Sequence, residues 1–263
     1  MAGASCQVPD QDSIELAVNQ WSAWAPGLED QPCWQAWAEG SSAIEGVPVP
    51  SVRFVEPLLR RRLSPVSRMA FQVAADCLKD ASPPPLCIFC SRYGEFARAY
   101  ELLCNLAQRE PLSPNTFSLS VHNTSCSLFS IWRRDHSPAT AIAAGEATLE
   151  AGFLEAWCAL SSGAAERVLI VYHDEPLPPA YRGQATSVGT SAALALLLQL
   201  PGEAKVGPHL RLEWRATNAG TASSGDVRDP ALEVLRLLLT GGDPIVLDSG
   251  RLAWTWSRHG AAH

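Results

Sequence analysis

Hydrophobic and polar positions along the chain follow two periods, the two-residue alternation of strands and the 3.6-residue spacing of helices. Residues 13–23 mix alternation with apolar positions and predict a first strand, which the turn residues 24–27 close. Trp34 and Trp37, three residues apart, share one face of a predicted short helix. The chain is therefore expected to begin with a strand covered by a small helix.

After residue 60, apolar runs typical of strands alternate along the chain with apolar stripes at helical spacing. The patterns predict helices at residues 67–79, 96–108, 148–160 and 230–239. They predict strands at residues 86–90, 139–143, 166–172, 189–198, 210–214 and 245–247, with Trp254 and Trp256 alternating on a last one. The strand, helix and strand between 139 and 172 predict a right-handed parallel crossover.

Composition favours one large domain. The chain has 263 residues, 47% hydrophobic and 18% charged, which is enough to bury one substantial core. Its net charge of −7 argues against a nucleic-acid partner. No apolar run approaches the length that spans a membrane, and the first residues lack the pattern of a signal peptide. We therefore expect a cytoplasmic protein that is not embedded in a membrane.

The eight cysteines are irregularly spaced, which favours reduced and mostly buried thiols over a disulfide framework. Cys87 and Cys90 have C-x-x-C spacing inside a predicted strand, where residues three apart point to opposite faces. No second pair stands at ligand spacing. The sequence therefore predicts neither a metal site nor a redox motif.

The stretch from residue 112 to 156 carries a family resemblance. It has a Ser-Pro pair at Ser113 and Pro114, an asparagine at Asn123 and a Ser-Ile pair at Ser130 and Ile131. Without a gap, this spacing resembles that of the β-ketoacyl synthases of the thiolase-like superfamily. In those condensing enzymes the corresponding residues line the dimer interface beside the acyl pocket. The resemblance therefore implies that this stretch faces a partner subunit.

The same family has a strand that ends in a nucleophilic cysteine at a tight elbow, followed by a helix. Here the elbow reads Ala144, Gly145 and Glu146, with Gly145 at the nucleophile position to within one residue. None of the three carries a thiol, so the acyl acceptor is absent. Cys126 is expected in the loop before the strand, as a small buried thiol.

The resemblance covers residues 13–200 and implies an α/β, thiolase-like fold, with a mixed, mostly parallel sheet covered by helices. The chain then reads as a single truncated ketosynthase-like domain, essentially the N-terminal half, with a shortened C-terminal part at 201–263. The other half of a complete condensing enzyme supplies two catalytic histidines. Residues 218–226 resemble the family's Asn-Ala-His-Gly-Thr loop with its histidine lost.

A condensing-enzyme half without these groups resembles a chain-length factor, the inactive partner of a ketosynthase. Residues 120–123 and 21–27 are similar to the compact factors of aryl polyene and other type II polyene pathways. That likeness implies a heterodimer with a ketosynthase, an acyl carrier protein partner that brings its own phosphopantetheine, and no cofactor bound by this chain. By itself the chain is expected not to be an enzyme but to act as a non-catalytic subunit of a β-ketoacyl synthase complex, with a residual decarboxylase activity left open.

The likeness also assigns candidate roles. The candidates for the tunnel and the interface are Phe117, Val121, His122, Asn123, Leu128 and Phe129, with alternation sending about half of the bulky ones into the chain's own core. The candidates for carrier-protein contact are Arg60, Arg61, Arg62 and Arg68, because guanidinium forks suit phosphate oxygens, although a triple arginine also suits a solvated helix face.

Glu146 has two interpretations. It stabilises the start of the following helix, or it mimics a malonyl carboxylate and assists proton transfer. The second interpretation supports a rival function, a decarboxylase of malonyl carrier protein that uses Glu146 or His122. A less favoured rival is a serine hydrolase at Ser191, where the G-x-S-x-G pattern lacks its second glycine.

Two further expectations complete the picture. His173, Asp174 and Glu175 follow a strand and are interpreted as structural or solvated. An exposed segment at 112–132 predicts a large apolar patch, an obligate heterodimer burying more than roughly 2,000 Å² and poor solubility of the isolated chain.

Overall fold

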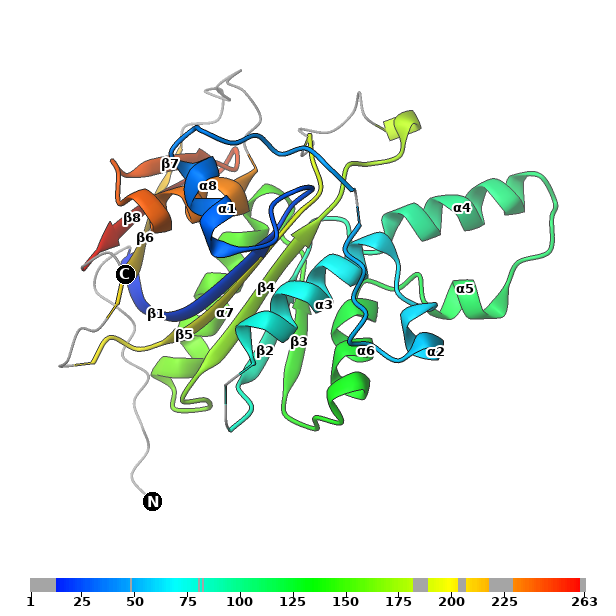
Figure 1. Ribbon diagram of the computed structural model, residues 1–263, viewed down its shortest axis with the longest axis horizontal. Coiled ribbons are helices and arrows are strands. Elements are labelled where there is room, and N and C mark those ends of the chain that lie inside the picture. The colour runs from blue at the N-terminus through cyan, green and yellow to red at the C-terminus, as the bar shows by residue number, and fades with distance from the viewer. Residues whose placement is uncertain are drawn as a thin grey trace.

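The computed structural model describes residues 13–47, 49–79, 81, 83–181, 189–202, 207–217 and 229–260. These residues build one eight-stranded sheet in the order β3-β2-β4-β5-β1-β6-β8-β7 (Figure 1). The strands are β1 (Ser13–Trp24), β2 (Leu86–Cys90), β3 (Ala139–Ile142), β4 (Val168–Asp174), β5 (Ala192–Gln199), β6 (His209–Ala216), β7 (Ile245–Asp248) and β8 (Leu252–His259). Every strand that the apolar pattern predicted is confirmed, with ends shifted by a few residues.

The sheet is mixed, as predicted, but it is not mostly parallel. Only β3, β2 and β4 run parallel, and the other five pairings among the described strands are antiparallel. The expectation of a mostly parallel sheet, which the family resemblance implied, was therefore wrong. The apolar runs report burial and carry no information about strand direction, so they could not correct it. β5 shows this directly: it is buried on both faces, yet it pairs antiparallel with both β4 and β1.

Helices cover both faces of the sheet, so the domain has three layers (Figure 1). They are α1 (Gln31–Ala38), α2 (Pro57–Arg60), α3 (Pro65–Cys77), α4 (Phe96–Ala107), α5 (Pro114–Ser118), α6 (Thr124–Arg133), α7 (Thr148–Ser161) and α8 (Pro230–Thr240). One core cluster joins α3 and α6 to the sheet, and the other joins α1, α7 and α8 to its opposite face.

Local sequence explains where the helices begin and end. α3 begins after Ser64, whose hydroxyl accepts the Ser67 backbone N–H, and proline occupies its first position. α8 begins in the same way after Asp229 and ends at Gly241, whose φ of +64° suits a residue without a side chain. These caps fix the two helices that cover opposite faces of the central strands.

Side chains predicted to lie on opposite or shared faces do so. Cys87 belongs to the α3 cluster and Cys90 to the α7 cluster, which confirms that the C-x-x-C pair straddles β2. Trp34 and Trp37 are both buried on one face of α1, with ring centroids 5.3 Å apart. The sequence pattern therefore located the core correctly even where it left strand direction open.

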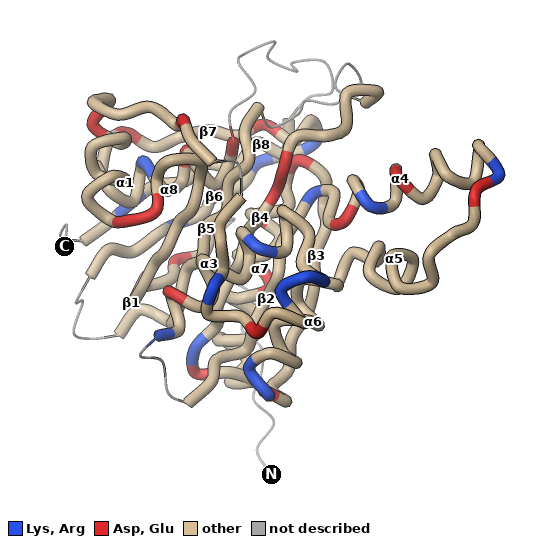
Figure 2. The backbone as a smooth tube through the Cα atoms, turned by 45° about the vertical axis from the view of Figure 1, so that its right-hand side comes forward, with Lys and Arg blue, Asp and Glu red and all other residues tan. Residues whose placement is uncertain are grey.

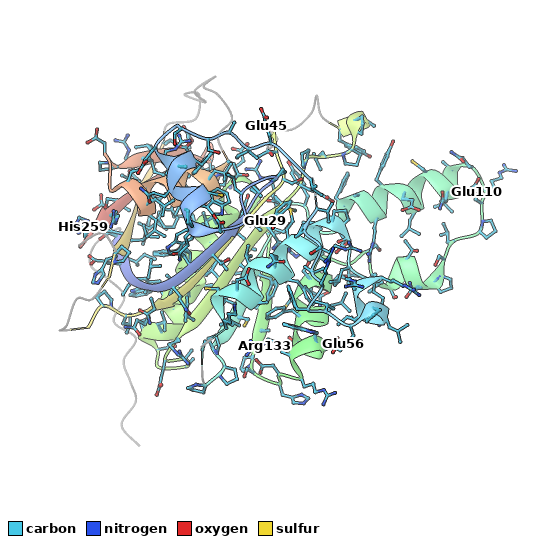
Figure 3. The ribbon with its side chains drawn as sticks, in the orientation of Figure 1. Glu29, Glu45, Glu56, Glu110, Arg133 and His259 are labelled. Carbon is cyan, nitrogen blue, oxygen red and sulfur yellow. The ribbon has the colours of Figure 1, made fainter. Side chains whose placement is uncertain are left out.

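An arm made of α4 and α5 projects from the body of the domain (Figure 1). Glu110 marks its far end in Figure 3. The predicted helix at 96–108 is confirmed, but only part of its apolar stripe is buried: Leu102 is enclosed, whereas Leu103 is 56% exposed and Leu106 is 58% exposed. No helix among the described residues is long and apolar enough to cross a membrane.

Candidate functional site

The parallel strands β3, β2 and β4 end at one edge of the sheet, and three loops leave from that edge. The loops comprise residues 91–95, 143–147 and 175–181. Ligand sites in parallel sheets form at the carboxyl ends of the strands, because loops from several strands converge there. This edge is therefore the candidate site.

The elbow between β3 and α7 is a tight turn. Gly145 has a φ of +61° and begins the 3₁₀ turn Gly145–Ala147, and a Cβ built on it would meet nothing within 4 Å. Its carbonyl accepts from Arg92 Nε at 3.2 Å and from Thr148 Oγ1 at 2.7 Å. Thr148 Oγ1 also accepts the Ala144 N–H at 3.0 Å. The turn is thus held by polar contacts and offers no thiol or hydroxyl at its tip.

Glu146 lies exposed in this turn, one residue before the α7 N-cap residue Ala147. Ala147 makes no side-chain capping hydrogen bond. The positive end of α7 favours a carboxylate at this place. The position of Glu146 therefore fits the helix-stabilising interpretation through charge.

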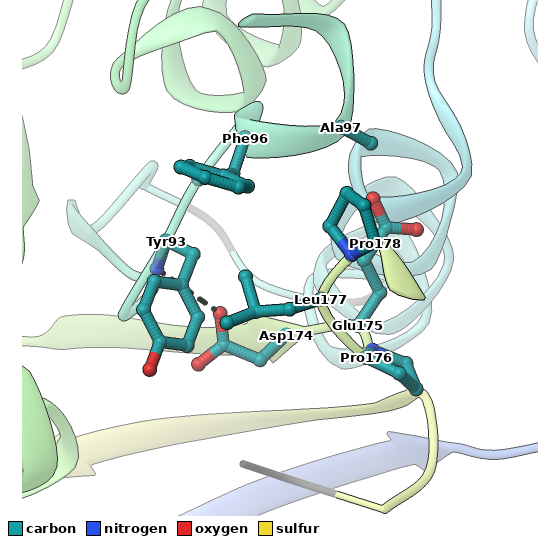
Figure 4. Close-up of a pocket in the computed structure, with 9 residues that line it drawn as sticks. Tyr93, Phe96, Ala97, Asp174, Glu175, Pro176, Leu177 and Pro178 are labelled. Carbon is teal, nitrogen blue, oxygen red and sulfur yellow. Dashed lines mark hydrogen bonds between the residues drawn. The ribbon is translucent and has the colours of Figure 1, made fainter. Parts of the chain in front are cut away.

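Asp174 ties the neighbouring loop together. Its buried carboxylate accepts from Ser91 Oγ at 2.8 Å, from the Arg92 N–H at 3.0 Å and from the Tyr93 N–H at 3.5 Å. Burial raises the pKa of Asp174, and these hydrogen bonds oppose the rise. The hollow beside this network has a volume of about 10 Å³, room for one water molecule (Figure 4). Asp174 is therefore a structural anchor, as expected, and the hollow is too small for a substrate.

His173 is also structural. It is 2% exposed, packs edge-on against Phe89 with ring centroids 5.9 Å apart, and burial lowers its pKa to about 4. A neutral, enclosed imidazole contributes to packing and has no access to a substrate. The third residue of the motif, Glu175, is partly buried, and burial raises its pKa to about 7.

Two buried carboxyl groups behind the elbow were missed from the sequence. Glu150, on α7, accepts from Trp256 Nε1 at 3.0 Å, and burial raises its pKa to about 7. Asp229 accepts the N–H groups of Ala231 and Leu232, and burial followed by repulsion from Asp174 raises its pKa to about 7. The Asp-Pro pair was a signal for the second group, since aspartate caps helices. Nothing in the sequence marks Glu150.

The segment at 112–132 differs from its prediction. It forms two helices, α5 and α6, and Cys126 lies inside α6 rather than in a loop. The residues that carry the family resemblance indicate a place in the family and do not report secondary structure. The helix that begins at Thr124 was therefore missed. Cys126 is nevertheless the small buried thiol expected: it is 6% exposed, and burial raises its pKa to about 11.

The helices divide the tunnel candidates into two groups. Phe117 is 66% exposed, Val121 is 50% exposed, and Asn123 is exposed as well. Leu128 and Phe129, at 3% and 2% exposure, pack in the chain's own core. About half of the bulky candidates point inward, as expected, but helical spacing and not strand alternation decides which.

His122 lies between these groups and is half-buried. Its Nε2 lies 2.8 Å from the carbonyl oxygen of Ser91. Because a carbonyl only accepts, Nε2 carries the proton in this contact. His122 therefore joins the turn before α6 to the loop that follows β2, close to the Asp174 network.

The four arginine candidates surround α2 and the start of α3. Arg61 and Arg62 are exposed, whereas Arg60 and Arg68 are half-buried. Arg68 donates to the Arg60 carbonyl at 3.4 Å, so these two stabilise their own loop. Figure 2 shows basic and acidic residues interspersed along the backbone.

The loop at 218–226, which resembles a catalytic loop without its histidine, lies outside the described residues. Within the described residues no group of three or more His, Cys, Asp or Glu side chains is placed to hold a metal ion.

A three-layer α/β domain with a strand, a tight elbow and a helix at the carboxyl edge is the architecture of a thiolase-like condensing-enzyme domain. Residues 34–257 match the family described as "Beta-ketoacyl synthase, N-terminal domain". That match spans most of the chain, and the chain belongs to this family. The predicted ketosynthase-type fold is confirmed, and the match extends past residue 200 into β6, α8, β7 and β8.

Solved structures give the same result. One chain of the complex of a ketosynthase (ApeO) with its chain length factor (ApeC) from Xenorhabdus doucetiae is 27% identical, with a TM-score of 0.79, and the match covers 93% of this chain and 99% of that one. The ishigamide ketosynthase/chain length factor is 15% identical, with a TM-score of 0.62, over 76% and 67% of the two chains. A β-ketoacyl synthase from Burkholderia phymatum is 11% identical, with a TM-score of 0.57, over 79% and 66%.

No curated protein matches the chain. The likeness to the first complex is nearly full-length in both directions, so the two chains have closely similar extents. The chain is thus a ketosynthase-like protein that is similar to the subunits of ketosynthase and chain-length-factor complexes.

Proposed function

We propose that this chain is a non-catalytic chain-length factor that pairs with a ketosynthase and shapes the acyl tunnel of that partner in polyene biosynthesis. The observation that carries the proposal is the elbow at Gly145. It keeps the strand-turn-helix geometry of a condensing enzyme, yet Ala144, Gly145 and Glu146 supply no nucleophile. In this proposal residues 1–263 act as one domain, in the cytoplasm, and the ketosynthase contributes the cysteine and histidines.

The surface beside the elbow supports a protein partner. β3 is the outermost strand at its end of the sheet. Among the described residues no strand pairs with its outer side, so its backbone N–H and C=O groups there can pair with a strand of another chain. The arm and α6 add exposed apolar side chains on the same side of the molecule: Leu103, Leu106, Leu112, Phe117, Val121 and Ile131. Large apolar side chains exposed in this way are costly in water, and a partner that covers them removes the cost.

Within that surface Phe117 and Val121 are the proposed tunnel residues. Both are large, apolar and exposed, so they are free to enter a cavity of the partner, whereas Leu128 and Phe129 are enclosed in this chain. A bulky group at the end of an acyl tunnel limits the product by excluded volume. Shortening Phe117 should therefore lengthen the product.

The acyl carrier protein is the second proposed partner. Arg61 and Arg62 are exposed beside Leu58, which is 78% exposed on α2. A paired apolar and cationic surface suits an acidic carrier protein and the phosphate of its phosphopantetheine. That group belongs to the carrier protein, and this chain needs no cofactor of its own.

The rival functions have weaker support. A decarboxylase that uses His122 as a base through Nε2 conflicts with the contact to the Ser91 carbonyl, in which that nitrogen holds its proton. Glu146 is exposed, without the burial that tunes a carboxylate for proton transfer. For a hydrolase, Ser191 precedes β5, whereas the elbow serine of that class follows a strand.

Co-expression with candidate ketosynthases tests the proposal. We expect a complex by native mass measurement, and longer products from Phe117→Ala than from the unchanged pair. Val246→Ala is the matched control, because Val246 is 57% exposed on β7 at the opposite end of the sheet. A chain that never pairs, or one that alone releases carbon dioxide from malonyl carrier protein, would refute it.

A further inference from the structure

A second cavity lies far from the elbow, between β1, α1, α8 and the end of β8. Its volume is about 460 Å³, within the range of about 300 to 1,000 Å³ that small-molecule sites occupy. Figure 3 places His259, the neighbour of the lining residue Arg258, on the opposite side of the molecule from the arm at Glu110. The cavity is therefore separate from the surface proposed for the ketosynthase.

A β-bulge shapes one wall of this cavity. Val18 pairs with Leu198 and Gln20 pairs with Leu197, so Asn19 is an extra residue in β1. Bulges bend a strand and redirect its side chains, and they are frequent at functional sites. Here the bulge brings Asn19, Gln20 and Trp21 to the cavity wall.

Among the described residues that line the cavity, Arg258 is the only one that carries a charge. Its Nε is buried without a hydrogen-bond partner among the described residues, and none of them forms an ion pair with its guanidinium. Burial lowers the pKa of Arg258. The buried Nε is closed to a ligand, so an anion in the cavity would meet the two terminal nitrogens of Arg258, and carboxylates match the guanidinium fork.

The other lining residues are of two kinds, amide side chains and apolar side chains. Amide side chains come from β1 and α1: Asn19, Gln20, Gln31 and Gln35. Asn19 Nδ2 already donates to Gln199 Oε1 at 2.7 Å and Gln35 Nε2 to Glu39 Oε1 at 2.8 Å, so these two amides offer a ligand chiefly their oxygens. Apolar contact comes from Trp21, Leu238, Leu239 and two prolines. The cavity thus combines one cationic donor, several amides and an apolar floor.

We propose that this cavity binds a small carboxylate that carries an amide and a short apolar side chain, as in an N-acylated amino acid. The carboxylate contacts Arg258, the amide contacts the asparagine and glutamine side chains, and the apolar group lies against Leu238 and Leu239. The same chemistry occurs at the end of a peptide chain. The proposal goes beyond the ketosynthase partnership and stands or falls independently of it.

Calorimetric titration with N-acetyl-leucine tests the site, on the chain alone or in complex with its ketosynthase, since the cavity is remote from that partner. We expect saturable binding below about 10 mM, and at least about tenfold weaker binding of the neutral N-acetyl-leucinamide, because a charged hydrogen bond is lost. N-acetyl-glycyl-glycyl-leucine separates the two sources: equal or tighter binding identifies a peptide end, and binding of the single amino acid alone identifies a free metabolite.

Variants complete the test. Arg258→Leu should weaken binding at least about tenfold, whereas Arg251→Leu, at an exposed arginine outside the cavity, should leave it unchanged. Leu239→Trp fills the cavity and should abolish binding without touching Arg258. Thermal unfolding of each variant verifies that it is folded. The proposal is wrong if the acid does not saturate, if acid and amide bind within twofold, or if the two arginine variants behave alike.

Discussion

Glu150 offers the sharpest test of how this core is built. It lies in the first turn of α7, its side chain is fully enclosed, and one oxygen accepts from Trp256 Nε1 at 3.0 Å. Its other oxygen has no partner among the described residues. Burial therefore raises the pKa of Glu150 from an ordinary value of 4.5 to about 7. We expect Glu150→Gln to change how stability depends on pH.

The sign follows from the two pKa values. As pH rises past 4.5 the unfolded chain loses this proton, whereas the folded chain keeps it until about pH 7. Stability is therefore fullest below pH 4.5, falls across the window from 4.5 to 7, and stays low above it. The difference between 7 and 4.5, at about 1.4 kcal/mol for each pKa unit, gives a loss of about 3 kcal/mol.

Glutamine has nearly the same shape, keeps an oxygen for Trp256 and has no proton to lose. The stability of Glu150→Gln relative to the unchanged chain should therefore rise by about 3 kcal/mol between pH 4.5 and pH 8. Urea denaturation followed by tryptophan fluorescence at several pH values measures it. Glu155→Gln, at an exposed position of the same helix, is the control and should show no such trend. Parallel pH profiles for Glu150→Gln and the unchanged chain would refute the reasoning.

Three more predictions concern packing. Gly152→Ala places a Cβ against Cys90 Sγ and should cost about 1–3 kcal/mol of unfolding free energy, which Cys90→Ala in the same chain should largely restore. Phe153→Ala removes a fully buried ring 4.8 Å from the Trp256 ring and should cost about 3–5 kcal/mol, against less than about 0.5 kcal/mol for the exposed Phe117→Ala. Cys87 and Cys126, whose pKa values burial raises to about 12 and about 11, should react with a disulfide reagent only after unfolding.

Sequence patterns were informative wherever burial alone decides the structure. Leu86–Cys90 and Val168–Asp174 are apolar runs between turns, and both are central strands. The α8 helix was predicted from its proline and its apolar stripe. In each case one local pattern and one local stop signal were sufficient.

The features that the sequence missed depend on contacts between distant residues. Strand direction at β5 is set by where the chain returns, which no apolar run encodes. The enclosure of Glu150 depends on Trp256, more than a hundred positions away in the chain. The exposure of Leu103 and Leu106 likewise depends on the arm leaving the body of the domain. Tertiary context, not local propensity, decides all three.

The elbow shows why retained geometry is no argument for retained chemistry. The Gly145 carbonyl accepts hydrogen bonds from Arg92, on the loop after β2, and from Thr148, on α7. The turn therefore couples the outermost strand to its neighbouring loop and helix, whatever side chain stands at its tip. A subunit whose role is to present β3 and the arm to a partner needs that coupling. In the proposed function that coupling serves the surface offered to a partner and requires no thiol at the tip of the turn, where Gly145 adopts a φ of +61° that a glycine accommodates without strain.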